Sequence, residues 1–301
     1  DQDKYNIKEV TLNNGTKTHV RIIGINHDTK FDDSKAGLTL SFTDPISLSQ
    51  FNPVSTSVSP SSAGWGGGVI GHNDYIPSQL KYTLNTVGTV GGKTIYDLIP
   101  NEIKKYTVSL KKDACIDRSS GSDKILDSWN SIDNTFFVES VAEVYGNDMS
   151  GSGLSNPPKW LGLEGTQYEL YENNNVKLDT TPDEVLKWST SISTTRWLRS
   201  LDYSQDDYLY NLKNDGTFSN TAIDSNIGVA PCFCLGERKT LNDYSWAELK
   251  EASETIASDP DGDVSKKFNI LMKNINQDVY NKKDVKLTDN TRTSVRIIGI
   301  N

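Results

Sequence analysis

The sequence predicts an α+β fold: a loop-rich mixed body, then a helical hairpin, then the first strands of a second copy of the body. Apolar residues alternate with polar ones over 38–42, which is typical of a strand. Residues 95–105 and 138–146 are expected to form short helices. The third observation is an internal repeat, because residues 3–26 recur at 278–301.

The opening segment is predicted to be a β-hairpin. Val10 and Leu12 precede the dipeptide Asn14-Gly15, a favoured two-residue turn, and residues 20–25 form the returning strand. The body that follows is expected to hold few regular elements. Residues 106–110 alternate and predict a strand, whereas the polar stretches 52–74, 147–158 and 202–228 are predicted as loops.

The repeat is the most informative feature of the chain. Residues 1–26 and 276–301 align without a gap at a constant offset of 275, and 16 of the 26 positions are identical. The sequence therefore reads as one unit of about 275 residues followed by the opening strands of the next. His19 faces Ser294 in this alignment, which makes His19 a poor catalytic candidate. The closing hairpin is expected to dock elsewhere, fray, or pair with a neighbouring chain.

An αα-hairpin is predicted between the two copies. Ser245 and Glu248 fit a capping box, residues 259–262 have turn chemistry, and Asp263 can cap a second helix. The expected division is a globular module over 1–240, a helical spacer over 241–277, and the start of the next repeat over 278–301.

Composition excludes several classes of partner. The net charge of -9 and a pI near 4.9 argue against nucleic acid, which rewards clustered Lys and Arg. No apolar run reaches the roughly 18 residues of a membrane span, so membrane insertion is not expected. The chain starts without Met or a signal peptide and resembles an excised piece.

The motifs that suggest catalysis or metal binding lack the spacing or the flanking elements that such sites need. Cys232 and Cys234 lie at i, i+2, roughly 7 Å apart on a strand, so two buried thiols are favoured over a metal or redox pair. The glycines at 66–71 lack the flanking strand and helix of a phosphate-binding loop, and Asp259 does not begin an EF-hand. His27 is favoured as a turn or strand-end residue. No catalytic residue, metal ligand or cofactor is predicted.

Short motifs across the chain resemble an uncharacterised domain of surface and phage-type proteins from Gram-positive gut bacteria. They are VRIIGINHD at 20–28, AGWG at 63–66, FFV at 136–138, EVYG at 143–146, EGTQY at 164–168, WLRS at 197–200, DG at 215–216, GVAPCFC at 228–234 and SWAEL at 245–249. Residues 201–203 depart from the family, which usually has a Pro-aromatic pair there. Within WLRS, Arg199 is expected to hydrogen-bond loop carbonyls, and its alternative role is a ligand anchor.

The resemblance implies a tandem, non-catalytic module with a C-type-lectin-like fold, located outside the cell, on a cell surface or on a phage virion. Its expected partners are a host or cell-surface glycan or protein, and neighbouring copies of the same module. The predicted ligand-binding side chains interleave aromatic rings with acids and amides. They are Tyr203, Asp206, Asp207, Tyr208, Tyr210 and Asn211. The alternative for this segment is a polar hairpin with its aromatic rings tucked underneath.

Three function classes follow from the sequence. The first is a receptor-binding or adhesin-like module that recognises a ligand through its loops. The second is a structural repeat of a stalk or virion, assembled by strand pairing between copies. The third is an oxidase-like enzyme related to the sulfatase-activating enzymes, which needs a cysteine pair able to meet at a metal. Cys232 and Cys234 are sequence neighbours and Cys115 stands alone, which disfavours the third class.

Overall fold

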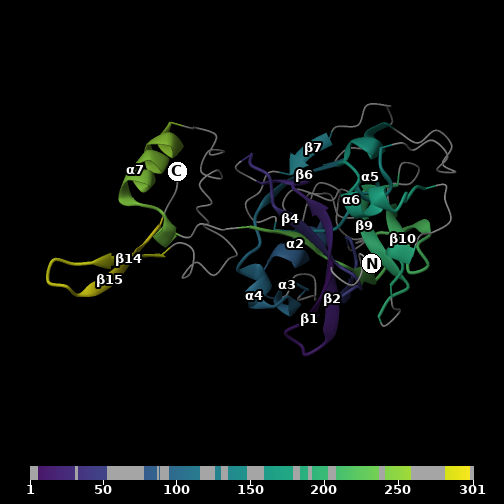
Figure 1. The fold of residues 1–301 in the computed structure, drawn as a ribbon, viewed down its shortest axis with the longest axis horizontal. Coiled ribbons are helices and arrows are strands. Elements are labelled where there is room, and N and C mark those ends of the chain that lie inside the picture. The colour runs from purple at the N-terminus through teal and green to yellow at the C-terminus, as the bar shows by residue number, and fades with distance from the viewer. Residues whose placement is uncertain are drawn as a thin grey trace, which may run out of the picture.

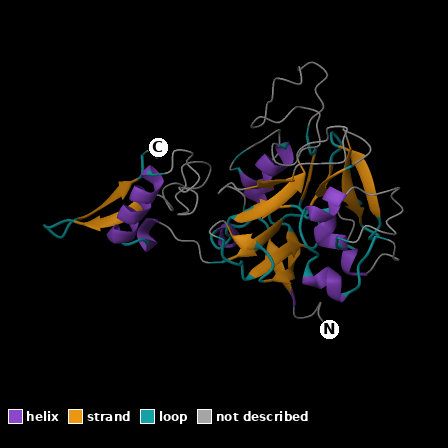
Figure 2. Ribbon diagram, turned by 90° about the horizontal axis from the view of Figure 1, so that it is seen from above, coloured by secondary structure: helices purple, strands orange, loops and turns teal. Residues whose placement is uncertain are grey.

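The computed structural model describes residues 6–30, 33–52, 78–86, 88, 95–115, 126–129, 135–147, 159–178, 184–188, 192–202, 208–236, 241–258 and 282–298. Over these residues the chain is a mixed α+β fold with mostly sheets and few, short helices (Figures 1 and 2). The predicted α+β class is therefore confirmed. Among the helices in these ranges, none is long and apolar enough to cross a membrane.

The first five-stranded sheet is antiparallel and has the order β1-β2-β4-β13-β8. Its strands are β1 (Ile7–Thr11), β2 (Lys17–Ile25), β4 (Leu38–Phe42), β13 (Cys232–Leu235) and β8 (Phe136–Phe137). The predicted hairpin and the strand at 38–42 are both confirmed. Gly15 closes the β1–β2 turn at φ 84°, a conformation that glycine adopts without steric cost.

The second five-stranded sheet has the order β11-β10-β9-β12-β5. Its strands are β11 (Phe218–Ala222), β10 (Tyr208–Lys213), β9 (Thr195–Leu201), β12 (Ile227–Val229) and β5 (Ser47–Ser49). Strands β9 and β12 are parallel, and the other pairs are antiparallel. The β9–β10 register shifts, because Leu201 pairs with Leu209 whereas Trp197 pairs with Asn211. Residues 198–200 therefore form a bulge, a device that re-aims side chains.

This second sheet corrects the prediction of a loop over 202–228. Strands β10 and β11, and β12 at the end of the stretch, lie within that range. Polar side chains in the segment bond to each other, as Asn211 Nδ2 does to Thr221 Oγ1 at 2.7 Å. Leu209 and Leu212 are fully buried at the same time. Polar composition consequently did not prevent strand pairing here.

A third sheet joins β3 (Thr29–Lys30), β6 (Leu110–Cys115) and β7 (Leu126–Trp129) in the order β3-β6-β7. The strand predicted at 106–110 was placed too early, because β6 begins only at Leu110. Residues before it make separate bonds to the end of β13, including Val108 N to Cys234 O at 3.1 Å.

The helices are short. They are α2 (Gln79–Asn85), α3 (Ile95–Leu98), α4 (Asn101–Lys104), α5 (Val141–Tyr145), α6 (Glu169–Asn173) and α7 (Trp246–Ala257), with 3-10 turns η1 (Lys159–Leu163), η2 (Glu184–Leu186) and η3 (Leu241–Asp243). The helix predicted over 95–105 is two helices, since Pro100 has no N–H to continue the first and instead precedes the second. The helix predicted over 138–146 is confirmed as α5, within narrower bounds.

One apolar core takes side chains from both five-stranded sheets. The ring of Phe233 on β13 lies 6.0 Å from that of Phe42 and 5.7 Å from that of Phe136. On the second sheet, the ring of Trp197 lies 5.9 Å from that of Phe51. These rings are almost completely buried, and burial of such side chains is the main source of folding free energy.

The C-terminal part holds α7 and a further hairpin, β14 (Lys282–Lys286) and β15 (Arg292–Arg296). The predicted capping box at the start of α7 is confirmed, because Glu248 N donates to Ser245 Oγ and Ser245 N donates to Glu248 Oε2. The second predicted helix and the motifs at 63–71 and 259–263 lie outside the described residues, and the proposed domain limits stay a prediction.

Candidate functional site

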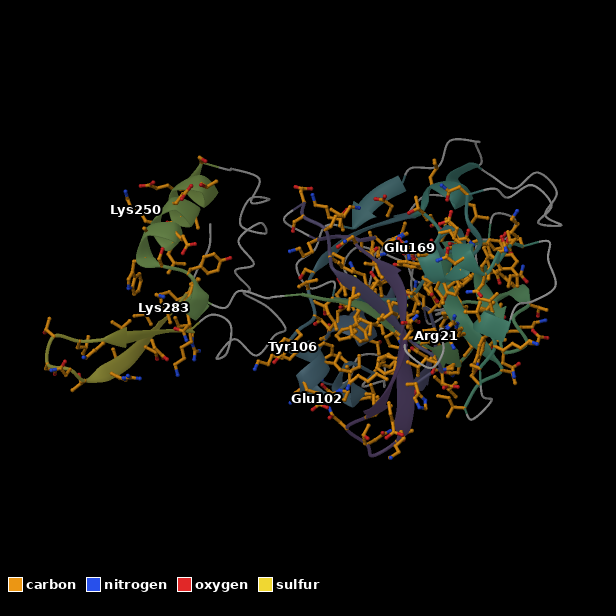
Figure 3. All side chains as sticks on the ribbon, viewed as in Figure 1. Arg21, Glu102, Tyr106, Glu169, Lys250 and Lys283 are labelled. Atoms are coloured by element: carbon orange, nitrogen blue, oxygen red, sulfur yellow. The ribbon has the colours of Figure 1, made fainter. Side chains whose placement is uncertain are left out.

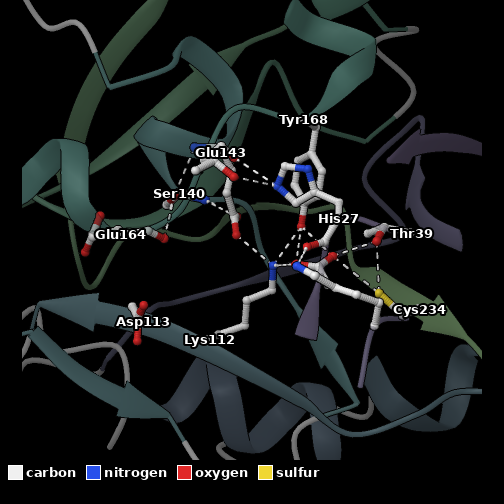
Figure 4. A network of polar contacts seen from close by, with 12 residues as sticks. His27, Thr39, Lys112, Asp113, Ser140, Glu143, Glu164, Tyr168 and Cys234 are labelled. Atoms are coloured by element: carbon white, nitrogen blue, oxygen red, sulfur yellow. Dashed lines mark hydrogen bonds and ion pairs between the residues drawn. The ribbon is translucent and has the colours of Figure 1, made fainter. Parts of the chain in front are cut away.

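A buried ammonium group stands at the centre of the most connected polar cluster of the described residues (Figure 4). Lys112, on β6, is 5% exposed. Its Nζ donates to Asp28 Oδ1, to Glu143 Oε1 at 2.7 Å, and to Tyr168 OH at 2.7 Å. Nζ also lies 4.1 Å from the centre of the Phe137 ring. One cation thus ties together segments that are far apart in the sequence.

The carboxylate of Asp28 accepts from four side chains. Besides Lys112, Thr39 Oγ1 donates at 2.6 Å, Tyr168 OH at 3.0 Å, and Cys234 Sγ at 3.3 Å, all to Oδ2. Asp28 is 6% exposed. A buried carboxylate with this many donors has its negative charge compensated within the protein.

The second ion pair of the cluster joins Glu143 and Arg199. The guanidinium is bidentate, with Nη1 donating to Oε2 and Nη2 to Oε1 at 2.9 Å. Arg199 also donates to three backbone oxygens, those of Asp113, Val138 and Glu164. The predicted structural role of Arg199 is confirmed, and its carboxylate partner Glu143 was not foreseen.

Local structure places each of these side chains. Glu143 is the third residue of α5 and reaches back to the N–H of Ser140, while Ser140 Oγ accepts from Glu143 N. Arg199 and Ser200 lie in the bulge of β9, and Ser200 Oγ accepts from Val141 N at 2.9 Å. The helix start and the bulge therefore hold each other in register.

The ion pairs keep each of the four groups in its charged form. These groups are the carboxylates of Asp28 and Glu143, the ammonium of Lys112 and the guanidinium of Arg199. Burial raises the pKa of Asp28, but Lys112 and the Thr39 hydroxyl outweigh burial and lower this pKa to about 2. Burial likewise opposes ionisation of Glu143, yet Arg199 and Lys112 lower its pKa. For Lys112, burial lowers the pKa, and Asp28 and Glu143 raise it above its ordinary value. Two cations and two anions make this set neutral.

A pocket of about 380 Å³ lies beside the network. The network lines it through Asp28, Lys112 and Glu143, and residues 162–166 form part of its wall. Its remaining described lining residues are His27, Thr29, Lys35, Lys111, Asp113 and Asn147. The lining is predominantly polar, with exposed Leu163 as an apolar element.

His27 lies at the edge of this pocket, just after β2. Its Nδ1 is 3.3 Å from Glu169 Oε1, its Nε2 is 3.1 Å from Thr166 Oγ1, and its ring centre is 4.3 Å from that of Tyr168. The position after β2 confirms the predicted strand-end placement. The ring nevertheless borders the pocket, which that prediction did not include.

The ligand-binding residues predicted from the sequence do not gather at this pocket. Tyr203, Asp206 and Asp207 lie outside the described residues. Tyr208 is partly buried on β10. Tyr210 is 2% exposed with its ring centre 4.6 Å from that of Phe218, and Asn211 is fully buried.

Tyr210 and Asn211 are therefore buried in this structure, whereas the binding surface assigned to residues 203–211 stays a prediction. The physical reason for this burial is the position of β10, whose central side chains over 209–212 are covered on both faces. The alternative prediction for this segment was a polar hairpin with its aromatic rings tucked underneath, and the buried ring of Tyr210 on the β10–β11 hairpin agrees with it.

Cys232 and Cys234 on β13 are free and buried, as predicted. Burial raises the pKa of both thiols well above the ordinary value. In the parts of the chain that the structure describes, no cluster of three or more His, Cys, Asp or Glu side chains could hold a metal ion.

Most of the network went unrecognised in the sequence, although its members lie in the quoted motifs. Asp28 ends VRIIGINHD, Glu143 begins EVYG, Tyr168 ends EGTQY, Arg199 lies in WLRS, and Cys234 ends GVAPCFC. Membership in these motifs was the one signal in the sequence that could have pointed to the network residues. Lys112 lies in no motif, and only the fold shows that it joins the others.

No family model, curated protein or solved structure matches this chain. The resemblance to the surface and phage-type domain remains a prediction.

Proposed function

We propose that this chain is a non-enzymatic recognition module that binds a polar group of a glycan or protein in the pocket beside Lys112. The observation that carries the proposal is an ion-paired network under a pocket of about 380 Å³. This volume falls within the range of roughly 300–1,000 Å³ that is common for ligand sites.

The network supports binding because it is rigid. Lys112, Glu143 and Arg199 are held by several partners each, so the polar floor of the pocket is ordered before a ligand arrives. Preorganisation lowers the entropy lost on binding. Lys35 and Thr166 are exposed at the pocket, and their ammonium and hydroxyl groups suit a ligand rich in hydroxyl groups.

The same charges favour binding over catalysis. General acid–base chemistry works best with a pKa near the working pH. The pKa values of Asp28 and Glu143 are lowered and that of Lys112 is raised, away from neutrality. The thiols of Cys232 and Cys234 stay protonated, whereas thiolates are the nucleophiles and metal ligands. Both features weigh against the oxidase-like alternative.

We further propose that the module has a C-type-lectin-like fold and acts on a cell surface or phage particle. Support comes from the motifs that resemble such proteins, since five of them contribute side chains to the network. A receptor-binding or adhesin role follows from a binding site on a rigid scaffold.

A glycan array probed with the intact chain tests the proposal, followed by calorimetric titration of the bound glycan. Lys35→Met and Leu163→Glu alter exposed pocket residues and are expected to weaken binding about tenfold or more, equivalent to about 1.4 kcal/mol. Tyr208→Ala is the matched control at the site that the sequence suggested, and it should bind like wild type.

Two results would contradict the proposal. If no glycan and no cell-surface protein extract gives saturable binding, the recognition function fails. If Tyr208→Ala abolishes binding while both pocket variants retain it, the pocket is the wrong site and the β10 segment is the right one.

A further inference from the structure

The two ends of the chain fold into the same hairpin. Each residue pair of β14 and β15 corresponds to a residue pair of β1 and β2 at an offset of 275 residues. For example, Lys282↔Arg296 corresponds to Ile7↔Arg21. The turns agree as well, with Leu12 N to Thr16 O at 2.8 Å and Leu287 N to Thr291 O at 2.9 Å.

The first hairpin is held to the body by five inward-facing residues that are at most 8% exposed: Val10, Leu12, Thr18, Val20 and Ile23. The second hairpin has the same residue type at each corresponding position: Val285, Leu287, Thr293, Val295 and Ile298. Over residues 7–25, none of the positions that differ between the copies is buried in the first hairpin. The second hairpin thus retains the complete set of side chains that contacts the body.

Four of those five side chains are exposed in the second hairpin, and Val285 is partly buried. Leu287 is 45% exposed, Val295 is 43% exposed and Ile298 is 92% exposed. Within the described residues, β15 pairs with β14 alone, whereas β2 also pairs with β4. The hairpin therefore presents an apolar face and a strand edge together.

The open end of the hairpin is anchored through Lys283, which pairs with Val295 and lies on the same face. Lys283 Nζ donates to Tyr244 O at 2.5 Å and lies 5.4 Å from a ring centre of Trp246, and Asp284 N donates to Asn242 Oδ1 at 2.7 Å. Figures 1 and 3 show β14 and β15 beside α7, with the turn pointing away from the two larger sheets. The anchor holds the open end of the hairpin beside η3 and the start of α7, while Leu287, Val295 and Ile298 remain exposed.

We infer that the hairpin of residues 282–298 docks on a second copy of this chain, in the place that residues 7–25 hold on their own body. In that place β15 pairs with β4 of the second copy, and Val295 lies opposite Phe42, as Val20 does now. Donor and acceptor surfaces differ, so the contact is head-to-tail and can extend into chains. This assembly does not depend on a ligand in the pocket.

The chain's own first hairpin, residues 7–25, occupies the place on the body where the second copy's hairpin would dock. Exchange therefore needs a state in which this resident hairpin has left the body. Refolding from denaturant supplies one, because both hairpins then compete for the same position. At low protein concentration the resident hairpin wins as an intramolecular partner, and at high concentration a neighbour competes.

The experiment refolds the full chain from urea at a series of concentrations and measures molar mass by sedimentation velocity. Wild type is expected to give monomers at low concentration and dimers and longer species at high concentration. Val295→Asp should remain monomeric throughout, because it places a carboxylate on the docking face. Ser294→Asp places the same group on the other face and should assemble like wild type.

A mixture tests the direction of the contact. Val295→Asp can accept a hairpin but cannot donate one, so an excess of it, refolded together with wild type, should shorten the chains to dimers. An excess of Ser294→Asp should not shorten them. Wild type that refolds only to monomers, or Val295→Asp that assembles like wild type, would overturn the inference.

Discussion

At the scale of single residues, the charges of the Lys112 network depend on one another. Lys112 has two anionic partners and Glu143 has two cationic ones, all buried. Desolvation of each ion is offset only while its partners are present. The network is therefore more sensitive to loss of one member than an exposed ion pair is.

Lys112→Met is expected to lower the free energy of unfolding by about 3–5 kcal/mol, because it leaves Asp28 and Glu143 buried without their shared cation. Lys111→Met is the adjacent control. Lys111 pairs with the exposed carboxylate of Asp33, and such pairs contribute under about 1 kcal/mol. Urea denaturation measures both, and equal losses would contradict the central position of Lys112.

Stability should fall in acid through Asp28. Its pKa is about 2 in the folded chain and near 3.8 ordinarily, so its ionised form is favoured by folding. This contribution, about 2 kcal/mol, is complete above pH 3.8 and is lost as the pH falls toward 2.

In Asp28→Asn the free energy of unfolding should consequently depend less steeply on pH between pH 4 and pH 2 than in wild type. The difference in slope corresponds to up to about one proton taken up on unfolding. The residual slope comes from other carboxylates, including Glu143, whose pKa is also lowered. Parallel urea titrations at each pH supply the comparison. Identical slopes for the two proteins would refute a depressed pKa at Asp28.

At the scale of elements, the position of α6 against β2 depends on the absence of a side chain at Gly24. A Cβ atom there would lie 2.8 Å from Tyr168 Cδ1 and 2.9 Å from Glu169 Oε2. The close approach brings Tyr168 to Asp28 and Glu169 to His27. One glycine thus allows a helix start to reach both the network and the pocket edge.

Gly24→Ala is expected to destabilise the chain by about 1–3 kcal/mol through this overlap. Gly37→Ala is the matched control, because a Cβ at Gly37 meets no atom within 4 Å, and it should change stability by less than about 0.5 kcal/mol. Thermal unfolding compares the two. A Gly24→Ala protein as stable as the control would show that α6 can shift without loss.

At the scale of the whole molecule, two hairpins with the same inward-facing residues lie in two environments. Val20 is 3% exposed and Val295 is 43% exposed, although both occupy the same hairpin position. The same inward-facing residue at the same hairpin position therefore does not determine burial. What covers the hairpin face decides it.

Val20→Ala is expected to destabilise the monomer by about 2 kcal/mol, from lost burial and the cavity left behind. Val295→Ala should alter the monomer by less than about 0.5 kcal/mol. Urea denaturation at low protein concentration, where the chain is monomeric, measures both. Equal effects would mean that the second hairpin face is covered in the monomer.

Local features of the fold were accessible from sequence because neighbouring residues determine them. Asn14-Gly15 specifies its turn, alternation at 38–42 specifies β4, and Ser245 with Glu248 specifies the start of α7. The loop assigned to 202–228 failed because its polar residues satisfy each other across β10 and β11. A pairing of that kind is invisible along a single segment.

The sequence by itself determined the repeat, because the two copies align without a gap. It also determined the hairpin turn, the start of α7 and the buried thiols, since each of these rests on spacing within a short stretch. Only the tertiary structure decided which charges meet. Lys112 and Glu143 are 31 residues apart, and Asp28 and Cys234 are 206 apart. Partner choice for a buried charge depends on which strands become neighbours, and long-range packing of the sheets sets that.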